Sequence, residues 1–407
     1  MFSLLKSKEI RGWCLFDFAI SSFPTLILTF FYGAFYAKKI ASDEILGTSL
    51  WGIAISFASI LSFLLLALLL FAGQHSKLQI KVTLFKFFFY FLIIFSFGLI
   101  FFSEGSNQVI PLLFVVISFV SFEFVNLFYN VTLYKIQKKK GVGALSNLGW
   151  AFGYLGGLLS LLFIFIIIQI SSSNDFIIFG VPVLIMIGPF VAGWTFVFGM
   201  PHFKNLGEIK FSKLHIPNLL ENLRSSGLTK FLISYFFFNN AVISIFAFAS
   251  MFSAFLFGLS ESQILFLGVF INLFGIVGCI TIGKFEDKIG SLKTVIICIL
   301  SLFIVTCLLF WVENVWIFLI LSLVIGFFIG PIQASSRSVL VKKINVENQL
   351  SAFSLYAIFG NMCSILGPLS VGVLIDLSGS IRYGILIIPL FFALSLVPFI
   401  SDKKINV

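Results

Sequence analysis

Residues 143–160 read GALSNLGWAFGYLGGLLS, and the apolar run LLFIFIII follows at 161–168. Five of the eighteen residues in the first stretch are glycine, although glycine costs about 1 kcal/mol relative to alanine inside a helix in water. Gly149, Gly153 and Gly157 are spaced by four and therefore share one face of a helix. In lipid, small residues on one face let two helix backbones approach closely. The segment is therefore typical of a tightly packed membrane helix.

The composition of the whole chain supports a membrane environment. Its 407 residues are 60% hydrophobic and 10% charged, with a mean hydropathy of +1.14, whereas a soluble domain is about 25% charged. The five cysteines form no C-x-x-C pair and the three histidines are scattered, so we expect free thiols, no metal site and no cofactor. No nucleophile–base constellation is evident either, and we do not expect an enzyme.

Twelve stretches are long and apolar enough to cross a bilayer core, which needs about 20 apolar residues of helix. Strands of a membrane barrel are shorter and alternate, so the predicted fold class is an all-α membrane protein of twelve transmembrane helices. A polar linker at 201–227 divides them into two six-helix halves, 1–200 and 228–407. The expected spans are 13–37, 48–72, 80–102, 109–134, 144–170, 176–200, 228–257, 262–283, 291–312, 315–337, 351–375 and 382–400.

The basic residues indicate how the chain is oriented. With the N-terminus in the cytoplasm, the loops on the opposite side hold only Lys38, Lys39 and Arg382, and the cytoplasmic loops hold the other loop bases. This bias follows the positive-inside rule and predicts a multi-pass protein of a bacterial inner membrane with both termini cytoplasmic. The net charge of +10 then reflects topology and attraction to anionic headgroups, so nucleic acid is not an expected partner.

Polar residues inside the expected spans are candidate functional residues, because a charge within the membrane is costly. Two acids lie there, Asp17 near the cytoplasmic face and Glu123 near the midplane. Glu123, Asn126 and Asn130 share one helix face, as do Asp17 and Ser21. We expect these residues to line a pathway for substrate and protons. Hydrogen bonding between packed helices is the alternative role.

The second half adds further polar positions. Asn240 and Gln333 lie within spans and are expected to join the same pathway. The loop GKFEDKIGSLK (283–293) carries Asp287 between two glycines that permit a tight connection. An acid here can pair with a base at a neighbouring helix end and close the cytoplasmic side in one conformation. Arg337 is the expected partner of Asp287 in this latch.

Several motifs occur in the order found in the vacuole effluxer-like branch of the major facilitator superfamily, and together they resemble that branch over nearly the whole chain. The branch includes a fungal autophagy-related vacuolar amino-acid effluxer and many bacterial permeases. Asn240 is a departure, since it stands where this branch usually carries an acid. The motifs are WCLFDFAISSFPTLILTFFYGAFYA (13–37), FYNVTL (128–133), SNLGWAFGYLGG (146–157), QASSRS (333–338), FSLYAIFGNMCSILGPL (353–369) and GSIR (379–382).

The resemblance implies a secondary transporter that works by alternating access around a central cavity. No GxxxxGK[ST] loop is present, so ATP is not the expected energy source, and protons carried by Glu123 and Asp17 are the simplest choice. The resemblance implies a small-molecule substrate, with efflux of amino acids or similar metabolites as the leading expectation. We expect the protein to act as a monomer. Another substrate class (sugar, drug-like cation or peptidoglycan fragment) stays open, as does a non-transporting sensor or scaffold.

Alternating access also suggests a role for the glycine face of 143–160. In this architecture the fifth span packs against the eighth, which belongs to the other half. We therefore expect that glycine face to slide against Gly268, Gly275 and Gly278.

Overall fold

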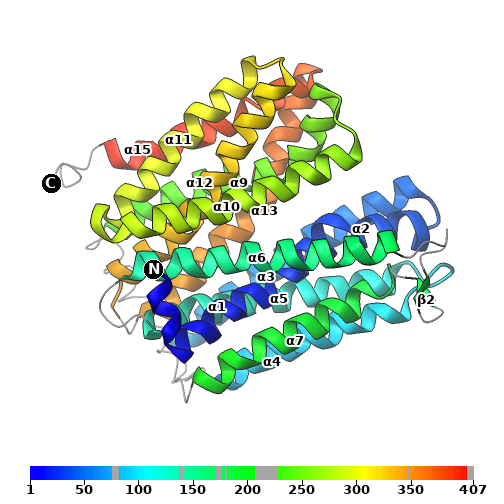
Figure 1. The fold of residues 1–407 in the computed structure, drawn as a ribbon, viewed down its shortest axis with the longest axis horizontal. Helices are drawn as coiled ribbons and strands as arrows, with labels where there is room; N and C mark the ends of the chain where they lie inside the picture. The colour runs from blue at the N-terminus through cyan, green and yellow to red at the C-terminus, as the bar shows by residue number, and fades with distance from the viewer. Residues whose placement is uncertain are drawn as a thin grey trace.

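The chain forms two groups of long helices that lie side by side (Figure 1). The structure, a computed structural model, describes residues 1–75, 82–136, 141–170, 177–178, 181–182, 184–206, 227–345 and 348–400. Most of the expected linker, 207–226, and the lysine-bearing loops 76–81 and 137–140 lie outside the described residues.

The first group, coloured blue to green in Figure 1, runs from the N-terminus to α7. Its elements are η1 (Phe2–Lys6), α1 (Lys8–Ile20), η2 (Phe23–Phe30), α2 (Tyr32–Phe35), η3 (Tyr36–Ile40), α3 (Glu44–His75), α4 (Val82–Phe97), η4 (Gly98–Phe101), α5 (Val109–Ile136), α6 (Val142–Ile170), β1 (Ile177–Ile178), β2 (Val181–Pro182) and α7 (Ile187–Leu206).

The second group, coloured green to red, runs from α9 to α15 (Figure 1). Its elements are α9 (Leu228–Phe257), α10 (Glu261–Ile289), α11 (Ser291–Trp311), α12 (Val315–Lys343), α13 (Gln349–Ser378), α14 (Ile381–Gly384) and α15 (Ile387–Ile400).

The predicted fold class is confirmed. Within the described residues, 11 helical segments have the length and apolarity needed to cross a membrane. The helix α7 completes the first group, where it packs against α1 and α4. Counting α7, which is not one of those 11 segments, each group contains six long helical segments among the described residues, with α1 to η3 forming the first and α14 with α15 the last.

The sixth helix differs most from its expected range, 176–200. Ile177 and Ile178 instead form a strand that pairs with Val181 and Pro182 in a short antiparallel ribbon. The helix α7 begins at Ile187 and continues to Leu206, six residues into the expected linker. Apolarity alone predicts burial in both cases, and Pro182, which has no N–H to donate, favours the ribbon over a continuous helix.

The first membrane helix is interrupted near its middle. Wide helical turns over Phe23–Phe30 follow α1, and Pro24 stands at their start. Proline removes one backbone hydrogen bond from a helix. Within the same turns the Thr29 hydroxyl donates to the Pro24 carbonyl at 2.9 Å. Wide turns of this kind are common at functional sites, and these directly follow the polar face of Asp17 and Ser21.

The glycine face of α6 packs against the first membrane helix of its own half. A Cβ atom at Gly149 would lie 2.5 Å from the Trp13 ring, and one at Gly153 would lie 2.8 Å from Asp17 Oδ1. Gly157 faces η2 in the same way. The prediction that this face contacts the eighth span is therefore wrong. Four-residue glycine spacing defines a smooth face, but it does not specify which neighbour covers that face.

A different face of α6 reaches α10, and the two helices do lie side by side (Figure 1). Asn147 and Tyr154, two turns apart, provide this contact, and the Asn147 Cβ would lie 2.6 Å from a Cβ at Gly283. The three glycines expected on α10 face separate neighbours: Gly268 faces Phe30 of η2, Gly275 faces Tyr154 of α6, and Gly278 faces the Phe327 backbone of α12.

Candidate functional site

Polar contacts between the two halves gather where α6 begins and where α10 and α12 end. We call this region the closed end. Its side chains come from α1, α5 and α6 in the first half and from α10 and α12 in the second. They are Asp17, Asn130, Ser146, Asn147, Glu286, Asp287, Arg337 and Lys342.

Arg337 extends from α12 into the first half and is buried. Its Nη1 lies 3.0 Å from Asn130 Oδ1 and 3.5 Å from Asp17 Oδ2. Its Nη2 donates to the Ser146 carbonyl at 2.9 Å, and its Nε donates to the Ser146 hydroxyl at 3.2 Å. The expected pairing of Arg337 with Asp287 is therefore wrong, because the acid that faces this guanidinium is Asp17.

Aromatic rings surround the Arg337–Asp17 pair. The guanidinium carbon lies 5.5 Å from the ring centroid of Trp13, 5.6 Å from that of Tyr129 and 5.5 Å from that of Trp150. The Tyr129 hydroxyl donates to Asp17 Oδ2 at 2.9 Å. Cation–π attraction strengthens when water is absent, so the rings offset part of the cost of burying the two charges. They also link Arg337 of one half to α1, α5 and α6 of the other.

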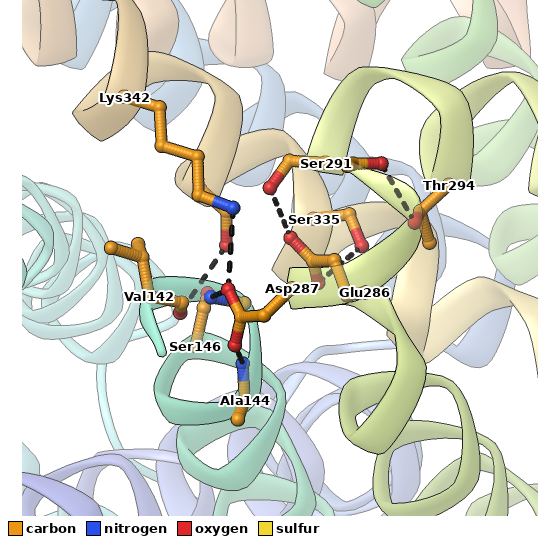
Figure 2. Close-up of polar contacts among 12 residues, drawn as sticks. Val142, Ala144, Ser146, Glu286, Asp287, Ser291, Thr294, Ser335 and Lys342 are labelled. Carbon is orange, nitrogen blue, oxygen red and sulfur yellow. Dashed lines mark hydrogen bonds and ion pairs between the residues drawn. The ribbon is translucent and has the colours of Figure 1, made fainter. Parts of the chain in front are cut away.

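Asp287 caps the first turn of α6 (Figure 2). Its Oδ1 accepts the Gly143 N–H and its Oδ2 accepts the Ala144 N–H, both at 3.0 Å. Lys342 Nζ lies 3.3 Å from Asp287 Oδ1. The first N–H groups of a helix lack partners within the helix and favour an anion. Asp287 does connect the halves, as the latch prediction requires, but its partners are α6 and Lys342.

A third acid, Glu286, is fully buried at the closed end. Asn147 Nδ2 donates to Glu286 Oε2 at 2.6 Å, and the Ser335 hydroxyl donates to the same oxygen at 2.8 Å. The Ser291 hydroxyl donates to Oε1, and Figure 2 shows both serine contacts. The sequence reasoning placed Glu286 in a loop and missed it. Its spacing of three from Gly283, which packs on α6, is the signal that could have found it.

Glu123 lies near the middle of α5 and is half-buried between the halves. The Asn361 amide of α13 donates to Glu123 Oε2 at 3.0 Å. Asn126, one turn along α5, is also half-buried. The structure thus places the predicted midplane acid at a contact between halves, opposite Asn361, which the sequence reasoning did not select.

The polar positions of the second half separate into two sets. Gln333 Nε2 donates to Asn239 Oδ1 at 2.8 Å, and the Tyr356 hydroxyl lies 3.4 Å from Gln333 Oε1. Asn240 turns away and donates to Cys363 Sγ at 3.1 Å. The neighbour of Asn240, rather than Asn240 itself, therefore joins the cluster around Gln333.

One other predicted residue, Ser21, has a local role. The Ser21 hydroxyl donates to the Asp17 carbonyl one turn earlier, at 2.8 Å, which is ordinary for serine in a membrane helix. Within the described residues, no group of three or more His, Cys, Asp or Glu side chains is arranged to hold a metal ion.

Solved structures with the same arrangement of helices identify the fold. The human organic anion transporter MFSD10 aligns with a TM-score of 0.71 at 14% identity, over 98% of both chains. The major facilitator superfamily transporter FucP aligns with a TM-score of 0.72 at 13% identity, over 98% of this chain and 100% of FucP. The chain has the fold of the major facilitator superfamily.

Sequence relatives identify the branch. The MFS-type transporter YxiO of Bacillus subtilis is 23% identical over 417 aligned positions, covering 96% of this chain and 94% of YxiO. Autophagy-related protein 22 of Cryptococcus neoformans is 22% identical over 197 positions, covering 44% of this chain and 34% of the relative. The family described as "Vacuole effluxer Atg22 like" matches residues 131–403, and the chain belongs to this family.

Proposed function

We propose that the chain is a proton-coupled exporter of a small polar solute, with Glu123 as the coupling carboxylate. The observation that carries this proposal is the hydrogen bond from Asn361 to Glu123, which joins the two halves near the middle of α5 at 3.0 Å. A carboxylate at this depth is costly when charged. It accepts hydrogen bonds at both oxygens when ionised and becomes partly a donor when protonated.

Proton binding at Glu123 is therefore linked to how the halves meet. A proton that neutralises the carboxylate weakens its attraction for the Asn361 amide, because bonds to a charged acceptor are the stronger ones. A ligand can shift a conformational equilibrium only by its difference in affinity for the two states. Glu123 supplies such a difference, since its partner Asn361 belongs to the half that moves relative to it.

The closed end supports alternating access as the mode of transport. Asp17, Asp287 and Arg337 join the halves at one end, the end where the sequence predicts cytoplasm from its lysines. In our proposal each half moves as a unit, with the two halves joined through 201–227. The chain lies in a bacterial inner membrane with both termini cytoplasmic, and it works as a monomer because one chain contributes both walls of the pathway.

Amino acids and similar amine-bearing metabolites are the substrates that we propose to test first. An ammonium group is a cationic donor that suits Glu123, and the amides of Asn239 and Gln333 with the hydroxyl of Tyr356 offer neutral hydrogen bonds. The chain belongs to a family of proteins similar to a vacuole effluxer, which favours export over import.

The test begins with a comparison of metabolites inside and outside cells that have or lack the gene. The enriched solute is then supplied, radiolabelled, to proteoliposomes under an imposed proton gradient. Glu123→Gln should abolish uphill accumulation and leave exchange of labelled for unlabelled solute partly intact. Glu104→Gln, at an exposed acid, is the control. Uphill accumulation by Glu123→Gln at the normal rate would rule out Glu123 as the coupling group.

A further inference from the structure

The buried pair of Glu286 and Asn147 suggests how the closed end opens. We propose that these two side chains form an acid–amide clasp that separates each time this end opens, which makes Glu286 a positioning residue of the transport cycle. The inference rests on the proposed alternating access, but it does not depend on Glu123 or on the identity of the solute.

The Glu286 carboxylate occupies space that the missing side chain of Gly143 leaves open. Glu286 lies one turn before the end of α10, and its carboxyl carbon is 2.5 Å from the position that a Cβ at Gly143 would occupy. Any side chain at 143 would displace the carboxylate. The same α6 turn donates its Gly143 and Ala144 N–H groups to Asp287. Two consecutive acids of α10 thus rest on the first turns of one helix of the other half.

This arrangement compensates an unfavourable local sequence. Acids at the C-terminal end of a helix meet the negative end of its dipole and are destabilising there. Glu286 and Asp287 are both in the last turn of α10, whereas α6 presents the positive end of its own dipole to them. The acids are therefore better placed when the halves are together at this end than when they are apart.

The donors to Glu286 come from both sides of the interface. Ser291 and Ser335 belong to the same half as Glu286, while Asn147 belongs to the other half. These three donors are neutral and stabilise the buried carboxylate through hydrogen bonds that the closed geometry orients. Opening this end removes Asn147 and admits water. Asn147 is thus the donor that Glu286 loses when the two halves separate at this end.

An isosteric pair of substitutions tests the clasp. Asn147→Asp keeps the shape of the side chain but places a second carboxylate where the amide now lies, 2.6 Å from Glu286 Oε2. Spin labels at Glu9 and Lys288, exposed residues at the closed end in opposite halves, report the distance between halves in nanodiscs without any transport measurement. The Asn147→Asp protein should shift the open-to-closed ratio roughly tenfold or more, the factor expected for losing one bond to a charged group.

Adding Glu286→Gln to Asn147→Asp restores one acid and one amide with their roles exchanged, and it should return most of the closed population. A role in packing alone predicts no such rescue, because both changes preserve size. Glu313→Gln, an exposed acid between α11 and α12, should leave the distances unchanged. An unchanged distance distribution in Asn147→Asp, or a double variant no more closed than Asn147→Asp alone, would overturn the proposal. A monodisperse elution profile confirms that each variant is folded.

Discussion

Removing the Arg337 charge tests the pairing that the structure assigns at the closed end. Arg337→Gln leaves Asp17 largely buried, with its side chain 14% exposed and the Tyr129 hydroxyl as its remaining donor among the contacts described above. Breaking a buried ion pair from one side costs roughly 3–5 kcal/mol, because an uncompensated charge stays behind. Asp17→Asn should destabilise by a similar mechanism, since Arg337 then keeps only the neutral acceptors Asn130 and Ser146.

The double variant decides between pairing and independent effects. Asp17→Asn with Arg337→Gln removes both charges, so its loss of unfolding free energy should be smaller than the sum of the single losses by roughly 1–3 kcal/mol. Titration with denaturing detergent in mixed micelles measures these free energies. The control cycle combines Asp287→Asn with Arg337→Gln and should be additive within about 0.5 kcal/mol.

The two cycles together can refute the assignment. Strict additivity between Asp17 and Arg337 would mean that the 3.5 Å ion pair contributes nothing to stability. A larger coupling between Asp287 and Arg337 would instead restore the latch expected from the loop sequence.

Two further predictions concern α6. Gly156→Ala should destabilise the first half by about 1–3 kcal/mol, because its Cβ would overlap the Phe18 carbonyl oxygen. Gly193→Ala is the control and should not destabilise it, because the space around Gly193 is open. A thermal-shift assay in detergent compares the two variants, and equal melting midpoints would contradict the packing. Asp287→Asn should increase the spin-label distance at the closed end, because the first turn of α6 loses its anion. Lys342→Gln should have a smaller effect, because the Lys342–Asp287 ion pair is partly exposed. A larger increase in Lys342→Gln than in Asp287→Asn would contradict the capping role of Asp287.

The sequence predicted the residue types that meet between the halves more successfully than it predicted their pairing. Asp287 and Arg337 both lie at the closed end, where the motif and the polar spacing place them. Their partners, α6 and Asp17, depend on the rotation of α10 and α12 about their own axes. A helix turns by about 100° per residue, so small differences in rotation exchange one neighbour for another without altering any sequence pattern.

The sequence did not identify Glu286 or Asn239 as candidate site residues, and the reason is the same for both. Glu286 precedes a motif acid and was assigned to a loop, because hydropathy cannot distinguish the last turn of a buried helix from the start of a solvated connection. Asn240 and Asn239 are adjacent, and their side chains point about 100° apart on α9. Composition treats them as equivalent, but packing against α12 and α13 assigns one to the Gln333 cluster and the other to Cys363.

The sequence by itself determined the solvent, the helices and the family. Its apolar stretches require lipid, because no aqueous fold can bury them, and most of their length is helical because lipid offers no partner for backbone hydrogen bonds. Ile177 and Ile178, which form a strand within the expected sixth span, are an exception. Only the tertiary structure decided which face of α6 meets α1 and which meets α10, and it is those contacts that bring Glu286 to Asn147 and Arg337 to Asp17. Such pairs join residues far apart in the chain, so their formation depends on how whole helices pack together.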